Sequence, residues 1–196
     1  MQKLKNIADD MLKTLSGIRG VKSCTLYGSL AAGTADEFSD IDIQIDVSGT
    51  DNGLFMLKLP HMLKKRMPVY YFDFAPSLAP EKYIISMALD EEDPFRMLDV
   101  TVTADPHCTT VTKQLLIDRN DPYSHILKLW TANLKHFLRG ADCRSDIEKM
   151  ARKLNIDPTL SNREILGATL NYLEENAPET MTKFIASCRQ HFEKQA

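Results

Sequence analysis

Residues 26–47 read LYGSLAAGTADEFSDIDIQIDV, and this stretch decides which fold the chain can adopt. A largely apolar segment over residues 21–27 stops at Gly28-Ser29. After a ten-residue spacer, DIDIQIDV at 40–47 alternates strictly between polar and apolar side chains. This period of two is typical of a half-buried β-strand, with its isoleucines on the core face and its carboxylates on the other. The stretch therefore predicts two strands connected through a Gly-Ser turn.

The same stretch carries residues suited to phosphate and metal chemistry. Glycine at position 28 allows the backbone to approach a ligand closely. If a helix begins there, the Ser29 hydroxyl and the amides after it can point at a phosphate. Asp40 and Asp42 share one face of the second strand, about 7 Å apart along it. Two carboxylates beside a phosphate cradle predict a site for one or two Mg²⁺ ions, because the like charges would otherwise repel each other. Asp46 shares their face, but we expect it to be a solvated strand end.

This pattern resembles the signature of the nucleotidyltransferase superfamily that shares the DNA polymerase beta palm-type fold, hG[GS], a spacer and Dh[DE]h. In that family a later strand supplies a third carboxylate as hDh. Residues 95–102, FRMLDVTV, resemble this element, which indicates Asp99 as the third carboxylate. Asp73 in YYFDF at 70–74 is a rival with similar apolar neighbours. We expect Asp99, since it begins an alternating run and lies late in the chain as the family pattern requires, although periodicity alone does not choose.

The acidic turn LDEED at 89–93 is similar to that of the adenylyltransferases that modify aminoglycoside and lincosamide antibiotics. The resemblance implies a nucleotidyltransferase that uses Mg²⁺ or Mn²⁺ and transfers AMP from ATP, or a nucleotide from another NTP, to a hydroxyl of a small molecule, such as an aminoglycoside-like antibiotic. Gly28 and Ser29 would bind the phosphates, and Asp40, Asp42 and Asp99 would be the metal-binding and catalytic residues. Two alternatives are a protein AMP-transferase of antitoxin type and a non-catalytic nucleotide-binding regulatory module.

The chain departs from the family pattern at the residues after the Gly-Ser pair. Many small members carry Arg after the Gly-Ser pair, where this chain has Leu30 and Ala32. Those cations would help to neutralise a triphosphate, so we expect Lys or Arg from other segments to replace them.

Hydrophobic periodicity outlines the remaining elements of the first part of the chain. Helices are expected over 2–16 and 54–66, and further strands over 69–75, 83–89 and 96–103, the last two forming a hairpin around the acidic turn. Residues 111–118 fit a strand or a helix equally well.

From about residue 124 the apolar period becomes 3.6, which predicts four helices. Trp130 falls in the apolar stripe of the first, together with Leu129, and we expect it in the core. Capping boxes at Ser145-x-x-Glu148 and Ser161-x-x-Glu164 mark two of the helix starts. The predicted fold class is α+β, a mixed nucleotidyltransferase-type sheet with flanking helices followed by a C-terminal helical bundle. The predicted domains are a catalytic domain over 1–120 and a helical domain over 121–196, which would help to choose the acceptor.

Composition limits the function classes. The chain has 196 residues, of which 43% are hydrophobic and 26% charged, so it can bury a sizeable core. Its formal net charge of −3 argues against binding nucleic acid by phosphate neutralisation. The four cysteines lack zinc-site spacing, and neither a signal peptide nor a membrane span is expected, so the predicted location is the cytoplasm. The acceptor, the nucleotide base and the oligomeric state are left open.

Overall fold

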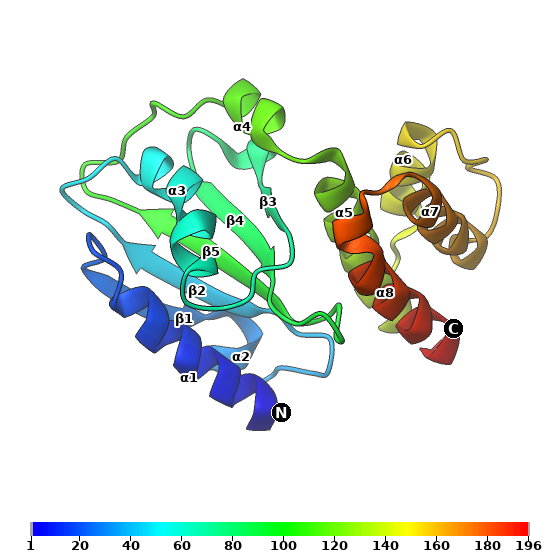
Figure 1. Cartoon of the computed structure of the whole chain (residues 1–196), viewed down its shortest axis with the longest axis horizontal. Helices are drawn as coiled ribbons and strands as arrows, with labels where there is room; N and C mark the ends of the chain where they lie inside the picture. Colours follow the sequence, from blue (N-terminus) through cyan, green and yellow to red (C-terminus); the bar gives the residue numbers. More distant parts are fainter. Residues whose placement is uncertain (1, 196) are drawn as a thin grey trace. The chain divides into compact units, whose positions relative to one another are not determined.

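The computed structural model of the chain describes residues 2–195 and consists of two compact units (Figure 1). The first comprises the chain up to Asp90 together with Phe95–Asn120. The second comprises Glu91–Pro94 and the chain from Asp121 onward.

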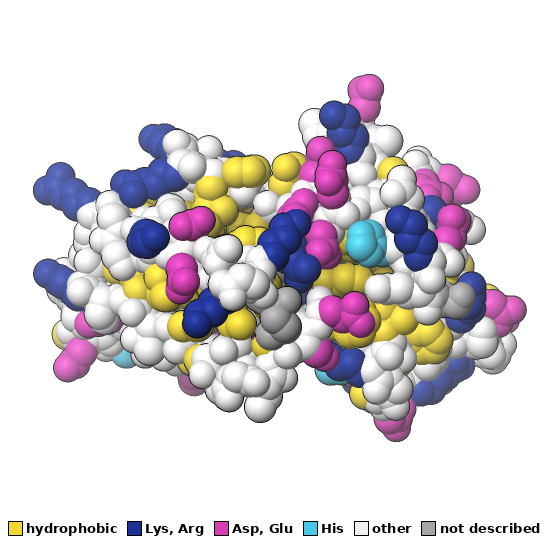
Figure 2. Space-filling view, turned by 90° about the horizontal axis from the view of Figure 1, so that it is seen from below, with side chains coloured by type: hydrophobic (Ala, Val, Ile, Leu, Met, Phe, Trp, Pro, Cys, Tyr) yellow, Lys and Arg dark blue, Asp and Glu magenta, His cyan; other side chains and the backbone are white. Residues whose placement is uncertain are grey.

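Polar and charged side chains cover much of the surface. Basic and acidic side chains are interspersed on the face seen in Figure 2, in line with the small net charge of −3. Over residues 2–195, none of the helices combines the length and the apolar character that crossing a membrane requires.

A five-stranded mixed sheet forms the centre of the first unit. Its strands are β1 (Ser23–Tyr27), β2 (Ile41–Asp46), β3 (Phe72–Phe74), β4 (Tyr83–Ala88) and β5 (Met97–Thr103). Their order in the sheet is β1-β2-β5-β4-β3. Only β2 and β5 run parallel, and the other neighbours are antiparallel, including the predicted hairpin of β4 and β5. The α+β class with a mixed sheet is therefore confirmed.

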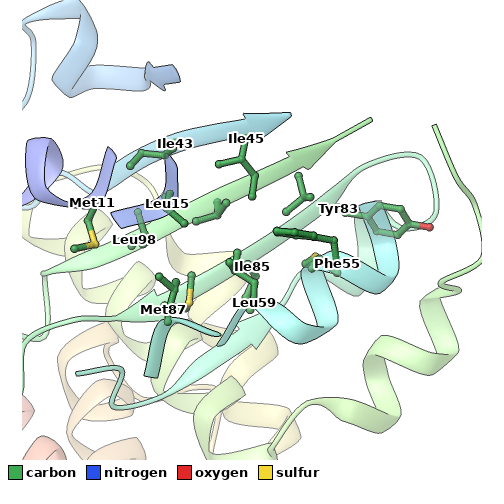
Figure 3. Packing of buried hydrophobic residues seen from close by; sticks show 14 of the residues in the cluster. Met11, Leu15, Ile43, Ile45, Phe55, Leu59, Tyr83, Ile85, Met87 and Leu98 are labelled. Atoms are coloured by element: carbon green, nitrogen blue, oxygen red, sulfur yellow. The ribbon is translucent and has the colours of Figure 1, made fainter. Parts of the chain in front are cut away.

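Two helices, α1 (Gln2–Ser16) and α3 (Asn52–Lys64), pack on the apolar face of this sheet. The isoleucines of β2 are completely buried there, as the period-2 pattern predicts. Figure 3 shows Met11 and Leu15 of α1 and Leu59 of α3 together with Ile43 and Ile85 of the sheet, all in one cluster of buried residues. Each fully buried side chain of this size stabilises the fold by about 1.5–3 kcal/mol. Because successive side chains of a strand point to opposite faces, burial of the isoleucines directs the polar face of β2 away from this cluster.

Two helix starts in the first unit depend on side-chain caps. Helix α3 begins two residues before the predicted position because the Asp51 side chain accepts a hydrogen bond from the Leu54 amide at 2.9 Å. The undecided segment forms α4 (Lys113–Arg119), whose start is capped by Thr112 accepting from the Leu115 amide. A short 3₁₀ turn, η1 (Pro76–Leu78), lies between β3 and β4.

The second unit is helical, as predicted. Its elements are α5 (Pro122–Leu138), α6 (Arg144–Lys153), α7 (Asn162–Asn176), the 3₁₀ turn η2 (Glu179–Met181) and α8 (Thr182–Gln195). Trp130 of α5 is fully buried, and its indole Nε1 donates to the Leu166 carbonyl at 3.0 Å. The prediction that Trp130 belongs to the core is confirmed, because its polar atom has a partner and its ring is covered.

The two predicted capping boxes have different outcomes. The box at the start of α7 is present: Ser161 Oγ accepts from the Glu164 amide, and the Glu164 carboxylate accepts from the Ser161 amide at 2.8 Å. The box at Ser145 is wrong, because α6 already begins at Arg144. The side chain of Glu148 is engaged elsewhere, accepting from Arg144 Nε at 2.7 Å and from a second guanidinium one turn later. Both carboxylate oxygens of Glu148 are thus taken by guanidiniums and do not close a capping box.

Candidate active site

The turn after β1 strongly favours glycine. Gly28 begins the one-turn helix α2 (Gly28–Ala32) with φ at +71°, in the left-handed region. A Cβ atom added to it would lie 2.1 Å from Asp42 Oδ2. The backbone of Gly28 therefore packs directly against the carboxylate of Asp42, and a short helix does begin at this turn, which meets the condition set for phosphate binding by Ser29. Gly33, also at φ +71°, ends this helix and has nothing within 4 Å of an added Cβ.

A turn closed by its own side chains precedes β2 and places Asp40 directly before the first residue of that strand. Asp36 Oδ1 accepts from the Phe38 amide at 3.0 Å and from Ser39 Oγ at 2.8 Å, and Ser39 Oγ accepts from the Asp36 amide at 2.8 Å. Asp and Ser side chains close turns in this way by bonding to nearby backbone groups. Ser39 was not singled out from the sequence, although the Asp36-x-x-Ser39 spacing is a signal of this structural role.

The strand register places the two alternative third carboxylates in one row. Asp42 of β2 is paired with Asp99 of β5, Asp99 with Ser86 of β4, and Ser86 with Asp73 of β3. Residues paired directly across neighbouring strands point to the same face. Asp99 is therefore one strand from Asp42, about 4.8 Å between the strand axes, while Asp73 is two strands further, roughly 10 Å from Asp99.

Burial separates the two alternatives further. Asp42 and Asp99 are partly exposed, whereas Asp73 is 1% exposed and Ser86 is 3% exposed. A carboxylate that must contact a ligand needs access to it. Register and exposure therefore favour Asp99 over Asp73 as the neighbour of Asp42 in a common site.

Tyr27 was missed by sequence reasoning and lies beside both carboxylates. It is paired with Asp42 across β1 and β2, and its hydroxyl lies 2.8 Å from Thr101 Oγ1 of β5, so its side chain spans β2. Burial raises the pKa of Tyr27 above its usual value, and the charges of Asp42 and Asp99 add to this, against the opposing hydrogen bond with Thr101. Its phenol is thus neutral at pH 7 and can donate or accept a hydrogen bond.

Asp46 has a local role at the far end of β2. Its Oδ1 accepts from the Ser48 amide at 2.8 Å and from Ser48 Oγ at 2.5 Å. These two bonds lower the pKa of Asp46 below its usual value. Asp46 therefore stabilises the turn after the strand, four residues from Asp42.

The carboxylates suit a hard divalent cation. Within residues 2–195, no three or more His, Cys, Asp and Glu side chains gather into a ready-made metal site. Mg²⁺ does not need such a cage, since it is usually held by one or two carboxylates together with substrate phosphates and water. Asp42 beside Asp99, with the Gly28 backbone against the Asp42 carboxylate, is an oxygen donor set of that kind.

Comparisons with known proteins agree with this geometry. Residues 3–93 match the family model described as Nucleotidyltransferase domain. This part of the chain, which holds Gly28, Ser29, Asp40 and Asp42, is therefore similar to a nucleotidyltransferase domain, while Asp99 lies beyond the matched range.

A solved structure of the GLD-2/RNP-8 complex is similar to the chain at a TM-score of 0.40 and 12% sequence identity. The match covers 100% of this chain and 66% of that one, so the chain spans just under two thirds of the length of its structural relative. No curated protein matches the chain.

Proposed function

We propose that this chain transfers a nucleoside monophosphate, AMP from ATP, to a hydroxyl group of a small molecule such as an aminoglycoside-like antibiotic, with Mg²⁺ or Mn²⁺ as cofactor. The observation that carries the proposal is the pairing of Asp42 with Asp99 on the polar face of the sheet, with Gly28 packed against Asp42. This arrangement lies in a chain whose residues 3–93 match a nucleotidyltransferase domain.

Gly28 and Ser29 would seat the β- and γ-phosphates of the nucleotide. Gly28 has no side chain to block an approach at the end of β1, and Ser29 offers a hydroxyl donor at the same turn. Asp42 lies on β2 and Asp40 directly precedes that strand, two residues earlier, and both would hold the divalent cation. The chemistry supplied by that cation is neutralisation of the charge on the α-phosphate in the transition state.

Asp99 would share the metal or act as the general base. In the second role its carboxylate accepts the proton of the acceptor hydroxyl while that oxygen bonds to the α-phosphorus and pyrophosphate leaves. A base needs hydrogen-bond reach and access to the acceptor, and Asp99 is partly exposed beside Asp42. The neutral hydroxyl of Tyr27 would be a hydrogen-bond donor or acceptor beside Asp42 and Asp99.

The proposal is tested by pyrophosphate release from a panel of NTPs and hydroxyl acceptors, including aminoglycosides, with the wild type and Asp42→Asn. The amide keeps the shape of the carboxylate and removes the charge that the cation needs, so we expect turnover to fall by about 10³ or more. Thermal stability should stay level or rise, because a like-charge pair is relieved.

Asp46→Asn is the matched control, since it makes the same substitution on the same strand and leaves an oxygen that can accept from Ser48. We expect it to retain transfer. Near-normal pyrophosphate release by Asp42→Asn would show that the site is misplaced. If no NTP and acceptor pair yields pyrophosphate, and nucleotide binding does not depend on a divalent cation, the proposed function is refuted in favour of a non-catalytic module.

A further inference from the structure

The second unit contains a groove that the proposed transfer does not use. It is a cavity of about 450 Å³ whose lining residues all come from α5 and α6. Both helices are labelled in Figure 1. Each helix contributes residues spaced i, i+3, i+4 and i+7, which share one helical face. On α5 this face begins at Leu129 and ends at His136, and on α6 it begins at Asp146 and ends at Lys153.

The floor of the groove is apolar. Leu129 and Ala132 of α5 are only partly buried, although Leu129 belongs to the apolar stripe that predicted core packing. Met150 of α6 lies beside them and is 2% exposed. Met side chains adapt their shape to a ligand because they are unbranched and polarisable. The groove therefore offers an apolar surface that the described part of the chain leaves partly open.

A buried amide at the edge of this floor has capacity for another hydrogen bond. Asn133 is 5% exposed and lines the groove. The one side-chain hydrogen bond that it makes within residues 2–195 is from Nδ2 to Met150 Sδ, at 3.9 Å. Sulfur is a weak acceptor, and an amide nitrogen carries two donors. The second donor of Asn133 is therefore available to an acceptor that enters the groove.

The rim of the groove has an excess of positive charge. Lys149 is neutralised by Asp146 at 2.9 Å, but Arg152 shares the carboxylate of Glu148 with a second arginine. Lys153 forms no ion pair in the described part of the chain. Some of this charge stabilises the C-terminal end of α6, where cations are favourable. The residues that line the cavity nevertheless include three cations and a single acid, Asp146, and this excess complements an anion that also has an apolar part.

We propose that the α5–α6 groove binds a small organic anion, with its carboxylate or phosphate against the basic rim and Asn133, and its apolar body on the floor. The size of the cavity lies within the roughly 300–1,000 Å³ of small-molecule sites. A stable protein interface would need about 20–30 residues on each side, and this groove is much smaller. The inference rests on the second unit alone and stands independently of the proposed transfer.

The experiment uses the full chain and the fluorescent apolar anion 8-anilinonaphthalene-1-sulfonate as probe, with octanoate, octyl phosphate and octylamine as competitors. We expect saturable binding of one probe molecule. Octanoate and octyl phosphate should displace it, and whichever does so at lower concentration identifies the preferred headgroup. Octylamine, with the same apolar chain and the opposite charge, should displace it at least tenfold less well.

Two variants locate the binding. Lys153→Glu reverses one rim charge, and Ala132→Phe fills the floor with a side chain that grows into open space. Each should weaken probe binding about tenfold or more, with the thermal unfolding midpoint recorded to verify folding. Lys183→Glu is the matched control, because it reverses an exposed lysine on α8 that lines a different cavity, and it should leave binding unchanged within about twofold.

Three results would overturn the proposal. One is unchanged probe binding in Lys153→Glu, which remains informative even if Ala132→Phe does not fold. Another is equal displacement by octylamine and octanoate, which would indicate unspecific apolar adsorption. The third is displacement by an acidic amphipathic peptide but not by octanoate or octyl phosphate, which would assign the groove to a helical protein partner instead.

Discussion

Replacing Gly28 by alanine tests whether the turn after β1 holds the Asp42 carboxylate in place. The substitution has two separable effects. A residue with a Cβ in the left-handed region costs about 1–2 kcal/mol. The new Cβ would also lie 2.1 Å from Asp42 Oδ2, so the carboxylate must rotate away, at a further cost of about 0.5–1.5 kcal/mol if it leaves its rotamer. The expected loss of stability is thus about 1.5–3.5 kcal/mol, and the unfolding midpoint falls by roughly 3–14 °C.

Gly33→Ala separates the two effects. Gly33 has the same φ of +71° at the other end of the same helix, but an added Cβ meets nothing within 4 Å. Gly33→Ala should therefore lose only the backbone contribution to stability, about 1–2 kcal/mol, which lowers the unfolding midpoint by roughly 2–8 °C. The Asp42 carboxylate stays in position in this variant, so its site should be intact.

The assay combines thermal unfolding with calorimetric titration of a non-hydrolysable ATP analogue in the presence of Mn²⁺. We expect Gly28→Ala to bind the analogue at least about tenfold more weakly, since one charged ligand of the cation is displaced. Gly33→Ala should bind within about twofold of the wild type. Equal destabilisation and equal affinity in the two variants would refute the reasoning, because Gly28 would then have no special relation to Asp42.

Other expectations follow from the same site and from one helix start. ATP should bind only with Mg²⁺ or Mn²⁺ present, because Asp40, Asp42 and Asp99 otherwise repel the triphosphate by about 4 kcal/mol for each close pair of charges. Calorimetry that gives the same ATP affinity with and without EDTA would contradict this. Asp99→Asn should slow transfer by about 10²–10⁴-fold and flatten the acidic limb of the pH–rate profile, while Asp73→Asn changes it by less than about tenfold. A larger loss in Asp73→Asn than in Asp99→Asn would exchange their roles without contradicting the similarity of residues 3–93 to a nucleotidyltransferase domain. Ser161→Ala should cost about 1 kcal/mol in denaturant unfolding without changing nucleotide binding, and an unchanged midpoint would mean that the capping box contributes nothing.

Several features were predictable because their causes are local. The alternation over 40–47 depends only on successive side chains of a strand pointing to opposite faces, so it identified the buried isoleucines of β2. The capping box at Ser161 joins groups three residues apart. The Gly-Ser turn after β1 was equally visible, since a strand pattern ends there.

One local pattern failed because groups outside it compete for the same atoms. Glu148 has the spacing of a capping box with Ser145, but two guanidiniums occupy its oxygens. One of them, Arg144, is itself held at 2.7 Å by the carbonyl oxygen of Leu160, sixteen residues away. A pattern that spans four residues contains no information about such partners.

The sequence by itself determined which residue types alternate on the polar face of each strand, and so which carboxylates were candidates. Asp99 and Asp73 both have apolar neighbours and pass this local test equally well. Only the strand order β1-β2-β5-β4-β3 decided that Asp99 lies next to Asp42 and that Asp73 lies two strands beyond. The contact of Gly28 with Asp42 and the reach of Tyr27 across β2 were decided in the same way. The physical reason is that side-chain alternation is a property of one strand, whereas the pairing of strands far apart in the chain is selected by the core packing and hydrogen bonding of the whole sheet.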